Sequence, residues 1–324
     1  MECSRIITPL WLKSALQDPE VTDICLNGTN ASFVDRGQGL EPLHLSQEHR
    51  FQGDQLRDWI LDILSEIGKS WDAKHPFVDA TLPSGHRIHV TFPPLSPQGI
   101  LVSLRRPAQS SPQADSTRIG STRWNSSSFY PQLVEAIQRG DSILISGATG
   151  SGKTTLARDL LEEVPAHERI IALEDTIELA PQHPHFISLT SRPPNADGFG
   201  EVTLRTLLKQ TLRMRPDRIV LGECRGSEVL ELLQALNTGH CGALATLHAN
   251  SPRDALRRIE LLCLLSCPGT LSFTGIRELV SLGIQWVVQV KKVQNCRRIT
   301  EVSKVEGREG DTILMRPVLG CELS

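Results

Sequence analysis

Runs of apolar residues in the second half of the chain are short, and stretches with helical spacing separate them. Four such runs predict buried strands, at residues 143–145, 170–173, 219–221 and 243–246. Residues 204–213 place leucines at spacings of three and four, which predicts a helix with one apolar face. Strands that alternate with helices in this way favour a parallel sheet covered by helices, which is an α/β fold.

The first 106 residues mix both kinds of pattern and predict a domain with helices and strands. Residues 59–64 have the apolar spacing of a helix. Residues 80–90 predict two short strands joined by a Pro-Ser-Gly turn, and residues 100–104 predict another strand.

A change of composition separates the two patterns. Residues 107–128 are rich in Ser, Pro, Gln and Asn and have few apolar side chains, so they cannot bury a core and are typical of a linker. We therefore predict one domain over residues 1–106, a flexible linker over 107–128 and a second domain over 129–324. Within the second domain, residues 285–290 and 297–300 predict further antiparallel strands.

Charge and composition restrict the classes of function. The 324 residues, 39% of them hydrophobic, suit about two domains with proper cores. With 34 basic and 37 acidic residues the net charge is −3, so no overall basic field attracts nucleic acid or anionic lipid. Aromatic residues make up only 4% of the chain, which leaves few side chains on which bases would stack. Nucleic acid is therefore not expected as a partner.

The chain is expected to be cytoplasmic. No apolar run reaches about 18 residues, and the N-terminus lacks the order of a signal peptide, so we expect no transmembrane segment. The eight cysteines are scattered and do not indicate a disulfide framework. Cys263 and Cys267 lack the second pair that a zinc site needs, so we expect both to be small buried residues.

A glycine-rich segment directly after residues 143–145 has the G-x-x-x-x-G-K-T pattern of a phosphate-binding loop. The strand before it and the helix after it make a chance glycine turn a poor explanation. Glycines let backbone N–H groups curl around phosphates, and the start of the helix adds a favourable dipole. Lys153 is expected to reach the β- and γ-phosphates of ATP, and the Thr154 hydroxyl to bind Mg²⁺. The predicted nucleotide-binding residues are Gly147, Ala148, Thr149, Gly150, Ser151, Gly152, Lys153, Thr154 and Thr155.

Two of the predicted strands end in carboxylates that suit hydrolysis. Glu223 follows one strand and is placed to orient and deprotonate a water molecule, although a surface carboxylate at a strand end has the same pattern. Glu174 ends another strand and is the next candidate base, with a second role toward Mg²⁺ through water. Asp175 and Glu178 follow it, and Asp175 would equally suit the cap of a helix.

Two histidines flank the strand predicted at residues 243–246. His240 ends Asn237-Thr238-Gly239-His240, and His248 lies in Thr246-Leu247-His248-Ala249-Asn250. Either imidazole is suited to hydrogen-bond a γ-phosphate and to report its loss, while an isolated histidine is more often structural.

Taken together, these motifs resemble the secretion-ATPase superfamily, which powers type II and type IV secretion and type IV pili. Its four signatures stand here as GATGSGKTT (147–155), RIIALEDTIEL (169–179), LRMRPDRIVLGECRG (212–226) and NTGHCGALATLHANSPRDALRRIE (237–260). The last two most resemble the CpaF-like branch, the motors of tight-adherence (Flp) pili, with conjugative relatives close behind. The resemblance extends to the amino-terminal half, through residues 20–28 and 78–88.

This resemblance implies a RecA-like P-loop domain with a smaller α+β, PAS-like N-terminal domain. It also implies a homohexamer that binds ATP and Mg²⁺, with arginines of the N-terminal domain completing the nucleotide site. Arg87 and Arg105 fit that role and Arg106 is the reserve candidate, although each would equally suit a surface ion pair.

The leading hypothesis is an ATP-hydrolysing motor that powers pilus assembly or secretion. Its partner would be an integral protein of the inner membrane, at whose cytoplasmic face the chain would act. The residues expected to carry catalysis are Lys153, Glu223, Glu174, Arg87, Arg105, His240 and His248. The alternative is a RecA-type translocation ATPase linked to conjugation or nucleic acid, which the net charge and the few aromatic residues disfavour. A nucleotide switch without turnover would not need the carboxylates.

Overall fold

The computed structural model describes most of the chain, in two compact units. The described residues are 8–29, 31–37, 39–43, 51, 54–72, 76–96, 99–107, 124, 127–195, 198–266, 271–294 and 296–318. The first unit comprises Met1–Arg118 with Asn195–Phe199, and the second comprises Ile119–Pro194 with Gly200–Ser324.

The predicted linker at 107–128 lies mostly outside the described residues. One of its described members, Trp124, is only 1% exposed. Its indole N–H donates to the buried carboxylate of Asp159 at 2.8 Å. Trp124 therefore packs in the core of the second unit.

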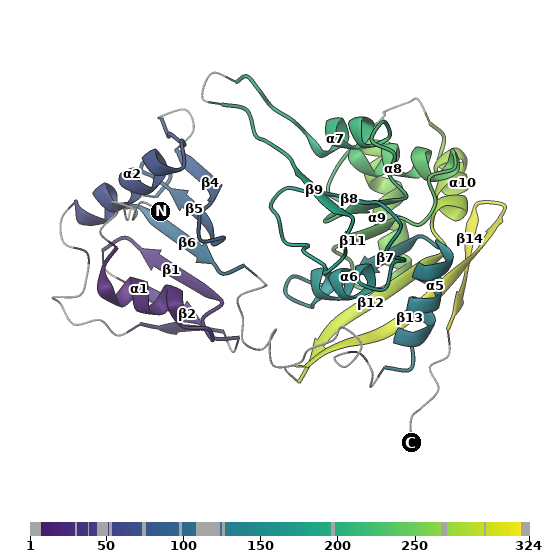
Figure 1. The fold of residues 1–324 in the computed structure, drawn as a ribbon, viewed down its shortest axis with the longest axis horizontal. Coiled ribbons are helices and arrows are strands. Elements are labelled where there is room, and N and C mark those ends of the chain that lie inside the picture. Colours follow the sequence, from purple (N-terminus) through teal and green to yellow (C-terminus); the bar gives the residue numbers. More distant parts are fainter. Residues whose placement is uncertain are drawn as a thin grey trace. The chain divides into compact units, whose positions relative to one another are not determined.

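The first unit is a six-stranded sheet with helices, as expected from the mixed pattern (Figure 1). Its elements are α1 (Leu10–Gln17), β1 (Asp23–Asn27), β2 (Ala31–Asp35), β3 (Leu40–Pro42), α2 (Gln55–Glu66), β4 (Phe77–Thr81), β5 (Arg87–Thr91) and β6 (Leu101–Arg105). The strand order is β3-β2-β1-β6-β5-β4, and all neighbours are antiparallel. The predicted hairpin is formed by β4 and β5, and the strand predicted at 100–104 is β6.

The core of the first unit lies on one face of this sheet. In β5, Ile88 and Val90 are buried, while Arg87 and His89 are on the other face. The apolar residues of α2 recur at helical spacing and join the same core as these strand residues; they are Leu56, Trp59, Ile60, Ile63 and Leu64. The ionisable residues of β5 are thus left on the face away from the core.

The second unit has the alternating order that the sequence predicts. Its elements are α5 (Tyr130–Arg139), β7 (Ile143–Ser146), α6 (Lys153–Leu161), β8 (Ile170–Glu174), β9 (Phe186–Thr190), α7 (Leu204–Thr211), β10 (Arg218–Leu221), α8 (Glu228–Asn237), β11 (Leu244–Leu247), α9 (Pro252–Ser266), α10 (Phe273–Gly283), β12 (Trp286–Val293), β13 (Cys296–Glu309) and β14 (Thr312–Pro317). The tail predicted as antiparallel strands is the β12–β13 hairpin, followed by β14.

The sheet of the second unit has the order β14-β13-β12-β7-β11-β10-β8-β9. From β12 to β9 every neighbouring pair is parallel. The carboxyl ends of β7, β11, β10 and β8 therefore meet at one edge of the sheet, which is where open parallel sheets bind ligands.

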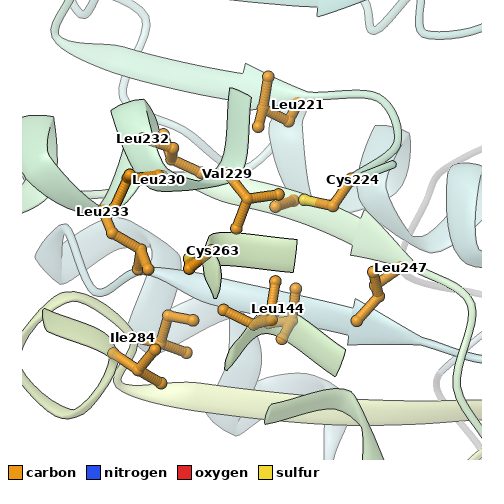
Figure 2. Close-up of a cluster of buried hydrophobic side chains, with 14 of the residues drawn as sticks. Leu144, Leu221, Cys224, Val229, Leu230, Leu232, Leu233, Leu247, Cys263 and Ile284 are labelled. Atoms are coloured by element: carbon orange, nitrogen blue, oxygen red, sulfur yellow. The ribbon is translucent and has the colours of Figure 1, made fainter. Parts of the chain in front are cut away.

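Successive residues of the central strands point to opposite faces, so the sheet has a core on each side. Leu144 and Leu221 pack with apolar residues of α8, and Cys263 from α9 joins the same cluster (Figure 2). Ile143 and Ile145 pack instead with α5 and α6. Cys263 is fully buried, as expected, whereas Cys267 lies outside the described residues.

Of the helices in the described part of the chain, none combines the length and apolar character needed to cross a bilayer.

Candidate functional site

The predicted phosphate loop connects β7 to α6 at the carboxyl edge of the parallel sheet. The structure explains why glycine occupies several positions of this loop. A Cβ on Gly147 would clash with the Val290 carbonyl oxygen and would lie 2.5 Å from the Ser151 hydroxyl. Gly150 and Gly152 have φ values of 72° and 103°, which disfavour other residues. The backbone therefore has the tight curvature that a phosphate cradle needs.

Lys153 is the first residue of α6, and its side chain folds back over this loop. Its Nζ donates to the carbonyl oxygens of Gly147 and Ala148 at 3.1 and 3.0 Å. Burial lowers the pKa of this ammonium group, while the charges of Glu223 and Glu178 act in the opposite direction. The lysine is thus held at the loop by weak carbonyl partners, which phosphate oxygens would replace.

Glu223 follows β10 after one residue and lies at the same edge. Its Oε2 accepts from Arg225 Nη2 at 2.7 Å, and its Oε1 lies 3.0 Å from His248 Nε2. Burial alone would raise the pKa of this carboxyl. The hydrogen bond and charge of Arg225, with the charge of Lys153, outweigh it and lower the pKa below its usual value. Glu223 is therefore an ionised carboxylate, as a general base must be.

His248 follows β11 and connects the two groups just described. Its Nδ1 lies 3.3 Å from Lys153 Nζ, while its Nε2 faces Glu223. Burial lowers the pKa of this imidazole, and the charge of Lys153 lowers it further. A neutral ring that accepts from the ammonium at Nδ1 and donates to the carboxylate from Nε2 satisfies both contacts.

Glu174, the second candidate base, has both oxygens engaged in hydrogen bonds, to the loop after β8 and to β9. Oε1 accepts from the backbone N–H groups of Glu178 and Leu179 at 2.9 Å each, and Oε2 accepts from Ser188 Oγ at 3.0 Å. Burial raises the pKa of this carboxyl against these hydrogen bonds. A Cβ on Gly222 would lie 2.8 Å from Glu174 Cγ, which explains the glycine before Glu223. These contacts favour a structural role for Glu174.

The loop that Glu174 holds places Glu178 beside the predicted magnesium ligand. Thr154 Oγ1 and Glu178 Oε2 are 3.4 Å apart. Among the described residues no group of three His, Cys, Asp or Glu side chains is arranged to hold a metal by itself. A hydroxyl and a carboxylate beside a phosphate cradle nevertheless suit Mg²⁺, which takes few protein oxygens together with phosphate oxygens. In the sequence, only its place in the acidic run after β8 indicated that Glu178 could belong to the site.

Arg225 is a site residue that the motif pattern did not single out. Its guanidinium contacts Glu223 and also Asp175, at 3.3 Å. Asp175 in turn accepts from Ser191 Oγ at 2.7 Å. The described residues between Asp175 and β9 form no helix, so Asp175 does not act as the helix cap that was the alternative.

The structure separates the two histidines. His240 precedes β11, and because β11 is parallel to β7 and β10, this position is at the amino edge of the sheet. A Cβ on nearby Gly242 would clash with Arg218, the first residue of β10, which confirms the placement. Within one chain, His248 and not His240 therefore lies at the phosphate loop.

The three arginine candidates belong to the first unit and differ in their surroundings. Arg87 and Arg105 are directly opposite each other on β5 and β6, on the face away from the core. Arg105 also lies 3.7 Å from Asp23 in a half-exposed ion pair. Arg106 donates to the carbonyl oxygens of Val21 and Leu16 at 2.7 Å each, and to that of Asp18. Arg106 therefore secures the end of α1, a structural role.

Comparison with known proteins places this site in a family. Residues 12–321 match the family described as Type II/IV secretion system protein. The chain belongs to this family. Its members are ATPases that bind ATP with Mg²⁺, so the predictions of the superfamily, of ATPase activity and of these cofactors are confirmed.

Curated relatives match the chain over most of its length. "Putative conjugal transfer protein Rv3659c" of Mycobacterium tuberculosis (strain ATCC 25618 / H37Rv) is 36% identical over 92% of this chain and 85% of the relative. "Type IV secretion system protein PtlH" of Bordetella pertussis (strain Tohama I / ATCC BAA-589 / NCTC 13251) is 35% identical over 86% of this chain and 87% of the relative. These similarities support a type IV secretion ATPase.

A solved structure confirms the fold. The pilus retraction motor PilT with bound ADP has a TM-score of 0.63 and 20% identity, over 99% of this chain and 84% of that chain. At this identity the likeness speaks for the RecA-like α/β fold alone.

Proposed function

We propose that this chain is a hexameric ATPase motor that powers assembly of a tight-adherence pilus, or a related secretion process, at the inner membrane. The observation that carries the proposal is the chain of contacts from Lys153 through His248 to Glu223. It joins the phosphate loop to the ends of β11 and β10. A charge-binding lysine, a neutral imidazole and an ionised carboxylate are the groups that hydrolysis of a bound triphosphate needs.

Each group in this chain has a distinct role in the proposed reaction. Lys153 exchanges its carbonyl partners for the β- and γ-phosphates, while Glu223 orients the attacking water and accepts its proton. His248 connects the two, so a change at the γ-phosphate alters the position of the base. Bound Mg²⁺ neutralises phosphate charge, and Thr154 and Glu178 are the residues we propose to hold it.

The CpaF-like assignment within the family rests on the motif likeness of residues 212–226 and 237–260. Such a motor would act on an integral membrane partner from the cytoplasmic face. The direct test is to purify the tagged chain from detergent-solubilised membranes and identify the membrane protein bound to it. We expect to recover a platform protein of a pilus or secretion system. If an ATPase-inactive variant no longer binds that protein, binding of the membrane partner depends on nucleotide. If the tagged chain is repeatedly purified with no membrane protein bound to it, the result would argue against this function.

A ring is expected to form in solution. Light scattering in the presence of Mg²⁺ and a non-hydrolysable ATP analogue should give a mass of about six subunits, the number that the family resemblance implies for a closed ring. The specific ATPase rate should rise with protein concentration as rings form. A monomer that hydrolyses ATP at a full, concentration-independent rate would contradict the ring.

Replacing Arg87 or Arg105 with alanine is expected to slow turnover much more than it weakens ATP binding. A guanidinium that meets the γ-phosphate during catalysis is worth about 10²-fold or more in kcat, because the charge it meets is greatest in the transition state. Steady-state kinetics and nucleotide titration measure the two effects. Arg36, which pairs with Asp18 in the same unit, offers a control, since Arg36→Ala should leave both values unchanged. Unchanged kcat in the Arg87 and Arg105 variants would show that neither residue takes part in catalysis, and would favour a role in surface ion pairs.

A conjugative role is the second candidate, because a relative that is 36% identical is described as a putative conjugal transfer protein. ATPase assays with and without single-stranded DNA distinguish the two functions. Stimulation by DNA would favour conjugation, and an unchanged rate would favour the pilus or secretion motor.

A further inference from the structure

The hairpin formed by β12 and β13 carries four cationic residues beside its turn. In the register of the two strands, Lys291 is opposite Arg298 and Lys292 is opposite Arg297. All four side chains belong to exposed residues. This end of the hairpin is therefore rich in positive charge, and Lys291 also pairs with Glu301 at 3.4 Å.

One of these two pairs faces the phosphate loop. β12 runs parallel to β7, and Gln289 is in register with Ser146, so the hairpin continues past the loop. A Cβ on Gly152 would lie 2.7 Å from Arg297 Cδ and 3.3 Å from its Cγ. The aliphatic part of the Arg297 side chain therefore covers the last residue of the loop. Cross-strand partners share a face, so Lys292 lies on that side and the pair of Lys291 and Arg298 on the other.

The position of Arg297 Cδ brings its guanidinium within reach of the expected phosphates. The group begins one bond beyond Cδ, and Cδ lies over Gly152, directly before the first N–H groups of α6. Backbone N–H groups at this point of a phosphate loop hold the phosphates of a nucleotide. A guanidinium there has the fork geometry that pairs with phosphate oxygens.

We propose that Arg297 is a nucleotide-binding residue of this chain, which contacts the phosphate groups held by the loop. The inference rests on the nucleotide site proposed above. It adds a residue of the β12–β13 hairpin to that site, outside the four family motifs. Because the contact exists whenever phosphate is bound, Arg297 acts on affinity for both ADP and ATP. It differs in this from the arginines of the first unit, which we expect to act on turnover.

Isothermal titration of the full-length protein with ADP and, separately, with inorganic tripolyphosphate tests the proposal. Arg297→Ala should weaken both by about tenfold, the scale of one charge-assisted hydrogen bond. Arg297→Lys, which keeps the charge but not the fork, should recover part of the loss. Arg298→Ala removes the same charge from the other face of the hairpin and should bind like the wild type. Thermal unfolding without ligand is measured in parallel to show that each variant is folded.

Three results would overturn the proposal. Unchanged affinity in Arg297→Ala would show that no contact is made. An equal loss of affinity in Arg298→Ala would show that the overall positive charge of the hairpin, and not a direct contact by Arg297, attracts the phosphates. Weaker ADP binding with unchanged tripolyphosphate binding would place the contact on the nucleoside. Lys153→Ala is titrated in parallel, because wild-type affinity in that variant would refute the nucleotide site itself and not only the role of Arg297.

Discussion

Replacing Lys153 with alanine is expected to abolish binding of ATP and ADP. The ammonium lies against the loop and donates to the Gly147 and Ala148 carbonyl oxygens. Without it, the β- and γ-phosphates would lose the cation that the loop itself supplies to balance their charge. We expect affinity to fall by about 10²-fold or more, which corresponds to about 3 kcal/mol. Titration with a fluorescent nucleotide and ligand-induced thermal stabilisation both measure this loss.

The matched control is Lys209→Ala, which removes an equal charge from the same unit. Lys209 lies on α7 and pairs with Glu231 at 3.3 Å, outside the contacts of the phosphate loop. That variant should bind nucleotide like the wild type. Circular dichroism must also show that Lys153→Ala is folded, since the change leaves the buried Gly147 carbonyl group without this donor. A folded Lys153→Ala protein with wild-type affinity would remove the phosphate loop from the proposed site.

Replacing Glu223 with glutamine is expected to leave ATP bound while removing most of the turnover. The amide keeps the size of the side chain but cannot accept the proton of the attacking water. Loss of a general base typically costs about 10²- to 10⁴-fold in kcat. The carboxylate lies near Lys153 and His248 without a described contact to the loop itself, so affinity should change little. Rapid mixing followed by measurement of phosphate release, beside equilibrium nucleotide titration, separates the two effects.

Two neighbouring carboxylates provide the comparison for Glu223. Glu178→Gln should weaken the dependence of binding on Mg²⁺, because Glu178 lies beside Thr154. Glu174→Gln should chiefly lower stability, since an amide has one acceptor oxygen for the three donors that Glu174 now satisfies. If Glu223→Gln turned over ATP at a near-normal rate, the base would have to be reassigned, and the geometry favours Glu178 over Glu174 for that role.

Much of the fold follows from local patterns in the sequence. Apolar runs of three or four residues, such as Ile143–Ile145, are typical of strands covered on both faces, and β7 has that environment. Glycines with positive φ, such as Gly150 and Gly152, occur in the loop because other residues rarely adopt that backbone conformation. The motif of nine residues therefore determined the place of the phosphate loop, and the alternation of elements determined the α/β class.

The tertiary structure decided which polar residues meet. Glu174 and Glu178 are four positions apart in one acidic run, yet one is occupied by backbone N–H groups and the other lies beside Thr154. His240 and His248 flank the same strand, but a parallel strand places its two ends at opposite edges of the sheet.

The roles of Arg106 and Arg297 likewise depend on the fold. Arg106 is separated from its carbonyl partners by more than 80 positions, and Arg297 covers a glycine that is far away in the chain. A sequence specifies spacing along the backbone, and hydrophobic periodicity reports only the burial of each position. The partners of a charged side chain depend on how strands are ordered and registered, and packing of the whole domain sets that order. The sequence by itself therefore determined the class of protein and the phosphate loop, while the assignment of single carboxylates, histidines and arginines required the folded chain.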